Sequence, residues 1–309
     1  MKEVFLLASF YKEYFQYLPQ GYDDVFILHS NSGEVYCFLA YLAKSFINKN
    51  NAKNPLFVAT KPYHEDIIEM YFPKARSVYY DMYLKEPRLG QLGDNWEYAG
   101  HKFWQIFSPR HFNTVNSNLG SVHYFDAMLK TLNLTREDAS KPAPKLAQRY
   151  KTNASKIAEK IGLDIDNFVI IAPEALTAKE FPSAFWNNLV KELYNNGYDV
   201  FINSVKSSSI KGKTCNLSFS ELFALAGFSK AVVSLRSGIS EFLIPAKTKN
   251  IMLCPRFHWS PLLTANQCIE AYSAMKLPFI DKNLNFELNT ELYSSESKLI
   301  ENVIQLIQK

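Results

Sequence analysis

The tripeptide Arg236-Ser237-Gly238 stands between a run of apolar residues and a segment whose apolar residues have helical spacing. The run 231–235 predicts a buried strand, and the residues after Gly238 predict a short helix. A helix start exposes free backbone N–H groups and the positive end of the helix dipole, and arginine adds a permanent charge. These residue types favour an anion site, and phosphate is the anion we expect. The alternative is a strand-ending arginine paired with a carboxylate, before a serine that caps the helix.

Four further polar residues are candidates for the same site. Glu241 falls in the first turn of the predicted helix, where it either responds to the helix dipole or accepts hydrogen bonds from ribose or sugar hydroxyls. Glu174, Thr177 and Lys179 follow the predicted strand 167–173, at the carboxyl edge where open α/β sheets bind ligands. Lys179 would neutralise a diphosphate, and the alternative for it is a solvated loop lysine.

A second group of polar residues follows the first predicted strand, 25–29. His29 ends this strand, Ser32 and Gly33 form the loop, and Glu34 begins the next helix. Glu34 is either an ordinary helix-start glutamate or a general base that removes a proton from a substrate hydroxyl. His29 is the reserve candidate for the base, because imidazole exchanges protons near neutral pH.

Short apolar strands alternate with helices on both sides of a polar linker. This alternation predicts parallel sheets of the α/β class, in two Rossmann-like domains that face each other across a cleft. The linker is the proline- and lysine-rich stretch 140–150. We therefore expect domains over 1–145 and 146–290, and a C-terminal helix in 291–309 that packs back on the first domain. A further amphipathic helix is predicted near the N-terminus.

Composition excludes several classes of protein. The chain has 309 residues, of which 47% are hydrophobic and 21% charged, as in soluble globular proteins. Its net charge of +4 is too small to indicate nucleic-acid binding. No run of about 18 apolar residues predicts a membrane span, so a cytoplasmic location is expected. The four cysteines are widely separated, which favours a reducing compartment over a zinc site or a disulfide framework.

A metal site is not expected either. Asp164 and Asp166 form an Asp-x-Asp pair, but the pair precedes the predicted strand 167–173. It would therefore lie at the edge of the sheet opposite to the ligand edge.

Residues 165–256 resemble the nucleotide-sugar half of GT-B glycosyltransferases, and most of all the lipopolysaccharide heptosyltransferase family. The stretch 172–182, with Ala-Pro-Glu-Ala and then Lys-Glu-Phe-Pro, is similar to that family's Asn-Pro-Gly-Ala turn and Lys-Arg-Trp-Pro. The stretch 219–225 is loosely similar to its Leu-x-Glu-Leu-x-x-Leu helix. At 236–241 the family has Asp-Ser/Thr-Gly-x-x-His, whereas this chain has arginine for the aspartate and glutamate for the histidine. Arg-Ser-Gly is similar to a motif that fucosyltransferases of this fold use against the donor diphosphate.

The resemblance implies a GT-B fold and an activity. The enzyme would transfer a sugar, of hexosyl or heptosyl type, from a nucleotide diphosphate donor on the second domain to a glycan acceptor on the first. The acceptor would be a cell-surface glycan of lipooligosaccharide or capsule type, and the transfer would be inverting and independent of a metal or cofactor. The stretch 29–35 is similar to the heptosyltransferase Gly-Asp loop, which implies Glu34 as the base. Arg236, Lys179 and helix N-termini would stabilise the leaving diphosphate.

Two alternatives to a transferase stay open. One is a module that binds a nucleotide sugar or glycan without catalysis, and the other is a GT-B enzyme that isomerises or hydrolyses the nucleotide sugar. The segment 101–112 interleaves cationic and aromatic residues. It is either a mixture of core and surface residues or a patch for a lipid-linked glycan at the inner face of the membrane.

Overall fold

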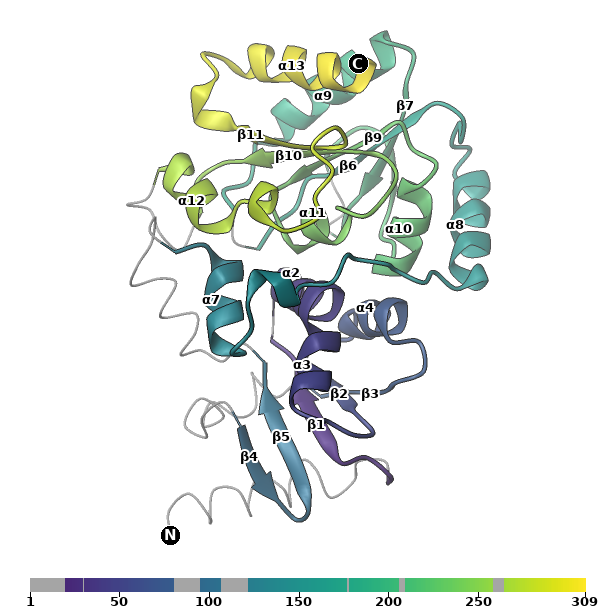
Figure 1. Ribbon diagram of the computed structural model, residues 1–309. Coiled ribbons are helices and arrows are strands. Elements are labelled where there is room, and N and C mark those ends of the chain that lie inside the picture. The colour runs from purple at the N-terminus through teal and green to yellow at the C-terminus, as the bar shows by residue number, and fades with distance from the viewer. Residues whose placement is uncertain are drawn as a thin grey trace. The chain divides into compact units, whose positions relative to one another are not determined.

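The computed structural model describes residues 20–29, 31–80, 95–106, 122–176, 178–205, 209–257 and 264–309. These residues form two compact units (Figure 1). The first unit ends at Lys145, and the second runs from Leu146 to Lys309 and includes residues 122–123. The predicted N-terminal helix lies outside the described residues.

The first unit is built on a sheet with the strand order β3-β2-β1-β5-β4. Strand β4 is antiparallel to β5, and the other neighbours are parallel. The strands are β1 (Asp24–Ile27), β2 (Leu56–Ala59), β3 (Arg76–Tyr79), β4 (Asn95–Tyr98) and β5 (His101–Gln105). The helices are α2 (Ser32–Cys37), the π-helix η2 (Phe38–Leu42), α3 (Ala43–Lys49), α4 (His64–Tyr71), α7 (Tyr124–Thr131) and the 3-10 helix η4 (Arg136–Asp138).

Strand β1 lies at the centre of this sheet, and every one of its side chains is buried. On one face, Val25 and Ile27 pack with Leu56 and Val58 of β2. On the other face, Phe26 packs with aromatic side chains of the helices and of neighbouring strands. The apolar runs that predicted β1 and β2 therefore form the core of the unit.

The second unit contains a sheet with the strand order β11-β10-β9-β6-β7-β8, in which all neighbouring strands are parallel. The strands are β6 (Phe168–Ala172), β7 (Asp199–Asn203), β8 (Lys213–Cys215), β9 (Ala231–Leu235), β10 (Lys249–Cys254) and β11 (Asn285–Asn289). The helices are α8 (Gln148–Lys160), α9 (Ser183–Asn195), α10 (Phe219–Ala226), α11 (Gly238–Phe242), α12 (Ala265–Tyr272), the 3-10 helices η5 (Ala274–Lys276) and η6 (Thr290–Leu292), and α13 (Glu296–Gln308).

The chain reverses direction across this sheet at β6. It runs outward through β7 and β8, and then returns to the other side of β6 to form β9, β10 and β11. Such a reversal leaves a crevice at the carboxyl ends of the two strands that flank it, here β6 and β9.

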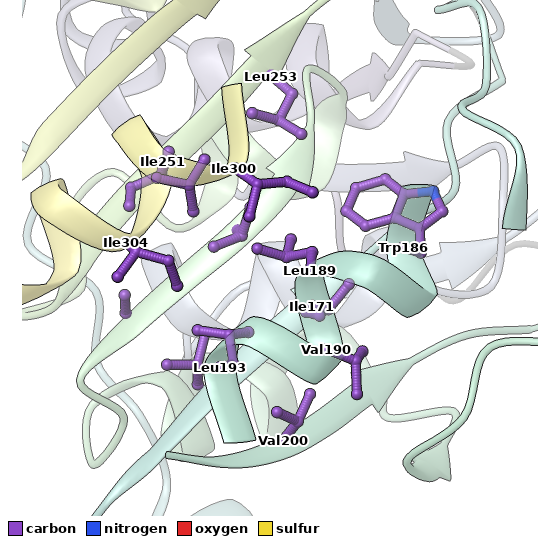
Figure 2. Packing of buried hydrophobic residues seen from close by; sticks show 14 of the residues in the cluster. Ile171, Trp186, Leu189, Val190, Leu193, Val200, Ile251, Leu253, Ile300 and Ile304 are labelled. Carbon is purple, nitrogen blue, oxygen red and sulfur yellow. The ribbon is translucent and has the colours of Figure 1, made fainter. Parts of the chain in front are cut away.

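The C-terminal helix α13 belongs to the core of the second unit. Figure 1 shows α9 and α13 on one side of the sheet. Ile300 and Ile304 of α13 pack with Leu189 and Leu193 of α9 and with Ile251 of β10 (Figure 2). The sequence suggested that this helix packs back on the first domain, but its apolar face is used within the second unit.

Helix α10 begins with a reciprocal capping arrangement. Ser218 accepts a hydrogen bond from the Glu221 backbone N–H at 3.3 Å, and the Glu221 carboxylate accepts from the Ser218 N–H at 3.2 Å. Ser218→Ala should lower the free energy of unfolding by about 1 kcal/mol, measured by urea denaturation. Ser295→Ala, which removes the cap of α13, is the variant for comparison. An unchanged urea midpoint for Ser218→Ala would contradict the expected contribution of the Ser218 cap.

Candidate functional site

The loops that follow β6, β9 and β10 meet at the carboxyl edge of the second sheet. Strands β6 and β9 pair in register from Val169 with Ala231 to Ala172 with Ser234. The Lys179 backbone N–H donates to the Arg256 carbonyl at 2.9 Å, and so ties the loop after β6 to the loop after β10. The residues that follow these strands therefore lie along one edge of the sheet.

Arg236 ends β9 in a buried position, with only 7% of its surface exposed. Its Nη2 donates to the Glu241 carboxylate at 2.6 Å and to the Tyr272 carbonyl, and its Nε lies 3.6 Å from the Glu287 carboxylate. The guanidinium is therefore surrounded by protein acceptors. This geometry agrees with the second interpretation of Arg236, in which the arginine pairs with carboxylates, rather than with the first, in which it binds a phosphate.

Glu287 is the residue of this cluster that the sequence analysis missed. It lies on β11, where Ser273 Oγ donates to it at 2.5 Å and the Ala274 backbone N–H at 2.7 Å. The available signal was a glutamate between the apolar residues Phe286 and Leu288, because a buried carboxylate requires a charged or hydrogen-bonding partner. Burial, with Glu287 as a smaller cause, raises the pKa of the neighbouring Cys254 thiol. Cys254 is therefore an unreactive thiol at neutral pH.

Ser237 and Gly238 form the start of α11, next to Arg236. Ser240 Oγ accepts from the Ser237 backbone N–H at 2.9 Å and donates to the Ser237 carbonyl at 2.7 Å. The Ser237 hydroxyl is buried and has no hydrogen-bond partner among the described residues. Ser237 and Ser240 have the arrangement of a capping box, but the Ser237 side chain makes no cap hydrogen bond, although the alternative interpretation expected one. The Ser237 hydroxyl is a hydrogen-bond donor that no described residue uses.

The loop after β6 contains the other donor-site candidates. The Glu174 carboxylate accepts from Ser204 Oγ and from the Val205 backbone N–H, the latter at 3.1 Å, and so ties this loop to the one after β7. Lys179 is exposed, and its ammonium makes no hydrogen bond or ion pair with a described residue. Thr177 lies outside the described residues.

Two exposed apolar side chains lie on these same loops. Leu176 is 83% exposed and Val205 is 75% exposed. Sequence reasoning missed both, because only the structure shows that two loop residues of this kind are left uncovered at a ligand edge.

In the first unit, Asn31 brings His29 and Glu34 together. The Asn31 backbone N–H donates to His29 Nδ1 at 3.1 Å, and the Asn31 side chain donates to Glu34 Oε1 at 3.3 Å. Glu34 and Gly33 are buried in the first turn of α2, and Ser32 is half-buried beside them. Because His29 Nδ1 accepts a hydrogen bond, the neutral ring carries its proton on Nε2. The Nδ1 lone pair of the neutral His29 ring is therefore already engaged by the Asn31 N–H.

The loop after β2 supports this arrangement through Thr60 and His64, which sequence reasoning did not select. Thr60 Oγ1 donates to the His29 carbonyl at 2.8 Å and lies 3.4 Å from His64 Nδ1. Burial lowers the pKa of His64 to about 3, and Lys61 and His29 add to the effect. Since the single Thr60 proton is given to His29, the neutral His64 ring donates from Nδ1. The pair fixes the end of β1, from which the Glu34 loop departs.

The Asp-x-Asp pair belongs to a turn at the amino end of β6. The Asp166 backbone N–H donates to the Asp164 carboxylate at 3.2 Å, and the Asp164 N–H donates to Asp199 at 2.8 Å. No group of three or more histidine, cysteine, aspartate or glutamate residues that could hold a metal occurs in the described part of the chain. The helices of that same part include none with the length and apolar character needed to cross a bilayer.

The first five residues of the aromatic and cationic segment 101–112 form β5. Phe103 and Trp104 are buried in the first unit, and Lys102 Nζ lies 4.2 Å from the centre of the Trp104 ring. For residues 101–106 the core interpretation therefore applies. Residues 107–112 lie outside the described ranges, so the expected contact with a lipid-linked glycan or membrane surface stays a prediction.

Solved structures show which known proteins share this fold. No protein-family model matches the sequence, and a comparison with curated proteins finds no match. The structure is similar to that of a family 9 glycosyl transferase from Veillonella parvula, with a TM-score of 0.59, 11% identity and coverage of 94% of this chain and 99% of that one.

Two heptosyltransferases are similar over nearly the same length. Escherichia coli ADP-heptose lipopolysaccharide heptosyltransferase II gives a TM-score of 0.57 at 12% identity, with 93% of this chain and 98% of that chain covered. The dodecameric iron-containing heptosyltransferase TibC from enterotoxigenic E. coli, in complex with ADP-D-beta-D-heptose, gives 0.53 at 12% identity, with 94% and 81% covered. The predicted α/β fold class is confirmed, and the fold of this chain is the GT-B fold of these glycosyltransferases.

Proposed function

We propose that the chain is a GT-B glycosyltransferase that moves a sugar from a nucleotide diphosphate donor to a glycan acceptor. The observation that carries this proposal is that the chain holds two different sites, one in each unit. The first unit has a buried carboxylate, Glu34, hydrogen-bonded in the first helical turn after β1. The second unit has a hydroxyl, a helix start and an exposed lysine at the carboxyl edge of its sheet. The carboxylate of the first unit supplies a base for the acceptor hydroxyl. The groups of the second unit supply hydrogen-bond donors and a positive charge for the leaving diphosphate.

The reaction follows from the chemistry of these groups. Glu34 accepts the proton of the acceptor hydroxyl while that oxygen attacks the anomeric carbon of the donor sugar. The bond from the anomeric carbon to the diphosphate oxygen breaks, and the nucleoside diphosphate leaves. A single displacement of this kind inverts the anomeric configuration. Negative charge on the leaving group is stabilised by the Ser237 hydroxyl, the first N–H groups of α11 and the Lys179 ammonium.

Arg236 has a positioning role in this account. Its contacts with Glu241, Glu287 and the Tyr272 carbonyl hold the start of α11 against the loop 272–274. Contact of Glu241 with ribose or sugar hydroxyls, and of Thr177 with the donor, stay predictions. The apolar side chains of Leu176 and Val205 offer a surface on which a nucleobase could pack. The proposed acceptor is a cell-surface glycan, which would place the protein at the inner face of a membrane.

Donor binding can be tested before the acceptor is known. Thermal unfolding of the purified chain should be measured with ADP-, GDP-, UDP- and CMP-linked sugars. A ligand at 100 times its dissociation constant adds about 2.7 kcal/mol to the free energy of unfolding, which is easily detected. A response to one class of nucleotide is expected, and no response to any of them would contradict the proposal.

Lys179→Ala should weaken binding of the preferred nucleoside diphosphate by about tenfold or more, since a charged hydrogen bond contributes about 1.5–3 kcal/mol. Isothermal titration measures the effect. Lys156→Ala is the matched control, because this lysine is also exposed but lies on α8. Equal affinities for the wild type and Lys179→Ala would remove the lysine from the donor site.

Activity should survive excess EDTA and 1,10-phenanthroline. The carboxylates of Glu241 and Glu287 already face Arg236, and Asp164 and Asp166 lie at the amino end of β6. The diphosphate is therefore expected to be stabilised by protein groups alone. Loss of turnover in chelator that manganese, magnesium or iron restores would show that a metal takes part.

A further inference from the structure

We propose that the first unit carries a second ligand site, for a neutral glycan, at the amino ends of β1 and β5. A pocket with a volume of about 500 Å³ lies there, between the start of β1, the end of α3 and the β4–β5 hairpin. Sites for small molecules range from about 300 to 1,000 Å³. Since His29 and Glu34 follow the opposite, carboxyl end of β1, this pocket is separate from the proposed base.

One wall of the pocket is held together by hydrogen bonds to the Asp24 carboxylate. The Asp24 side chain is buried and accepts the Lys53 backbone N–H at 2.7 Å and the Trp104 Nε1–H at 2.9 Å. These two bonds fasten the segment before β2 and strand β5 to opposite sides of β1. The wall is therefore held by buried charge-assisted hydrogen bonds.

Three residues at the rim of the pocket have positive φ values. Ala99 and Gly100, the turn of the hairpin, have φ values of 51° and 82°, and Asn51 has 49°. Glycine adopts this left-handed region freely and asparagine tolerates it, but the β carbon of alanine opposes it. All three residues line the pocket. A two-residue hairpin turn requires positive φ values at both positions, so the turn itself imposes them on Ala99 and Gly100.

The charges of the pocket exclude an anionic ligand. It is lined by Asp23, Asp24 and Glu97 against a single cation, Lys102. Glu97 lies directly opposite Lys102 in the hairpin, yet the lysine ammonium is directed to the Trp104 ring. No described residue donates a hydrogen bond to the Glu97 carboxylate. Phosphate groups, including those of nucleotides and acidic lipids, would be repelled.

The available polar groups match a polyhydroxylated ligand. One carboxylate oxygen of Asp23 accepts a hydrogen bond from the Asn54 side-chain amide at 2.7 Å. The other oxygen accepts none from a described residue. This second Asp23 oxygen and the Glu97 carboxylate can accept hydrogen bonds from the hydroxyl groups of a ligand. The Asn51 carboxamide can both donate and accept. In the described part of the chain, no three such side chains converge in the way that a metal ion requires. A neutral sugar fits this combination better than an anion or a metal.

The test is direct binding, and it does not depend on sugar transfer. The full chain should be titrated with lactose, maltotriose and chitotriose by saturation-transfer NMR. At least one should bind saturably, and Glu97→Ala should raise its dissociation constant about tenfold or more, as expected when a charged hydrogen bond is lost. Since Glu97 is exposed, its replacement should leave the melting temperature unchanged.

Glu159→Ala is the matched control, because it removes an exposed carboxylate from α8 in the second unit and should leave binding as in the wild type. Saturable binding that Glu97→Ala does not weaken would place the sugar elsewhere and overturn the proposal. Absence of binding for all three sugars would also overturn it. Binding of ethanolammonium or Ca²⁺ at the same residues, more tightly than any of the three sugars, would also overturn the proposal, because the pocket would then be a cation site.

Discussion

Arg236→Met is expected to lower the free energy of unfolding by about 3–5 kcal/mol, because it leaves the carboxylates of Glu241 and Glu287 buried without their cation. Both carboxylates are almost inaccessible, with side-chain exposures of 5% and 6%. Urea denaturation followed by circular dichroism measures the loss. Arg236→Lys should recover only part of it, because a single ammonium cannot reproduce the contacts of a planar guanidinium.

Arg256→Met is the matched control for this prediction. Arg256 also pairs with a glutamate at the carboxyl edge of the same sheet, but its side chain is 51% exposed and that of Glu291 is 32% exposed. A surface pair of this kind contributes about 0–1 kcal/mol. The double variant Arg236→Met/Glu287→Gln should be less destabilised than Arg236→Met alone. Wild-type stability of Arg236→Met would show that the guanidinium is not part of a buried network, and would return it to the donor phosphate.

Glu34→Gln is expected to lower turnover by about 10²–10⁴-fold while donor affinity stays nearly unchanged. Glutamine keeps the shape and can still accept the hydrogen bond from Asn31, but it cannot take a proton from the acceptor hydroxyl. Steady-state rates with the preferred donor and a glycan acceptor measure the loss. Titration of the donor measures whether binding is preserved.

Glu65→Gln is the control for the base, because Glu65 also lies in the first turn of a helix that follows a strand of this sheet. Its turnover should match the wild type. His29→Asn should reduce activity less than Glu34→Gln, since His29 Nδ1 already accepts the Asn31 N–H. Near-normal turnover of Glu34→Gln, together with a folded but inactive His29→Asn, would assign the base to the histidine.

The sequence predicted the elements that have strong apolar patterns. Strands β1, β2, β6, β7, β9 and β10 are short apolar runs, and helices α9, α10 and α13 have clear helical spacing. The hairpin of β4 and β5 was not predicted, because its turn is Ala99-Gly100 rather than a favoured Asn-Gly pair. Helix α8 was missed because its buried residues are the small Ala154 and Ala158. Strand β8 has only three residues at the edge of the sheet.

The contacts of the candidate site depend on residues that are distant in the sequence. Arg236 follows strand β9 as expected, but its partner Glu287 lies on another strand. The alternation of strands and helices gives no register for β11, and so this pairing could not be predicted. The same applies to Thr60 and His64, which reach His29 only because β1 and β2 are neighbours.

Transfer of a sugar is the central claim, and product analysis by mass spectrometry tests it most directly. The chain should be incubated with the nucleotide sugar that raises its melting temperature and with a cell-surface glycan preparation. The account predicts equal amounts of free nucleoside diphosphate and of a glycan that is heavier by one sugar, both lost in Glu34→Gln. Saturable donor binding without product would instead identify a binding module, and release of nucleoside diphosphate with free sugar alone would identify a hydrolase.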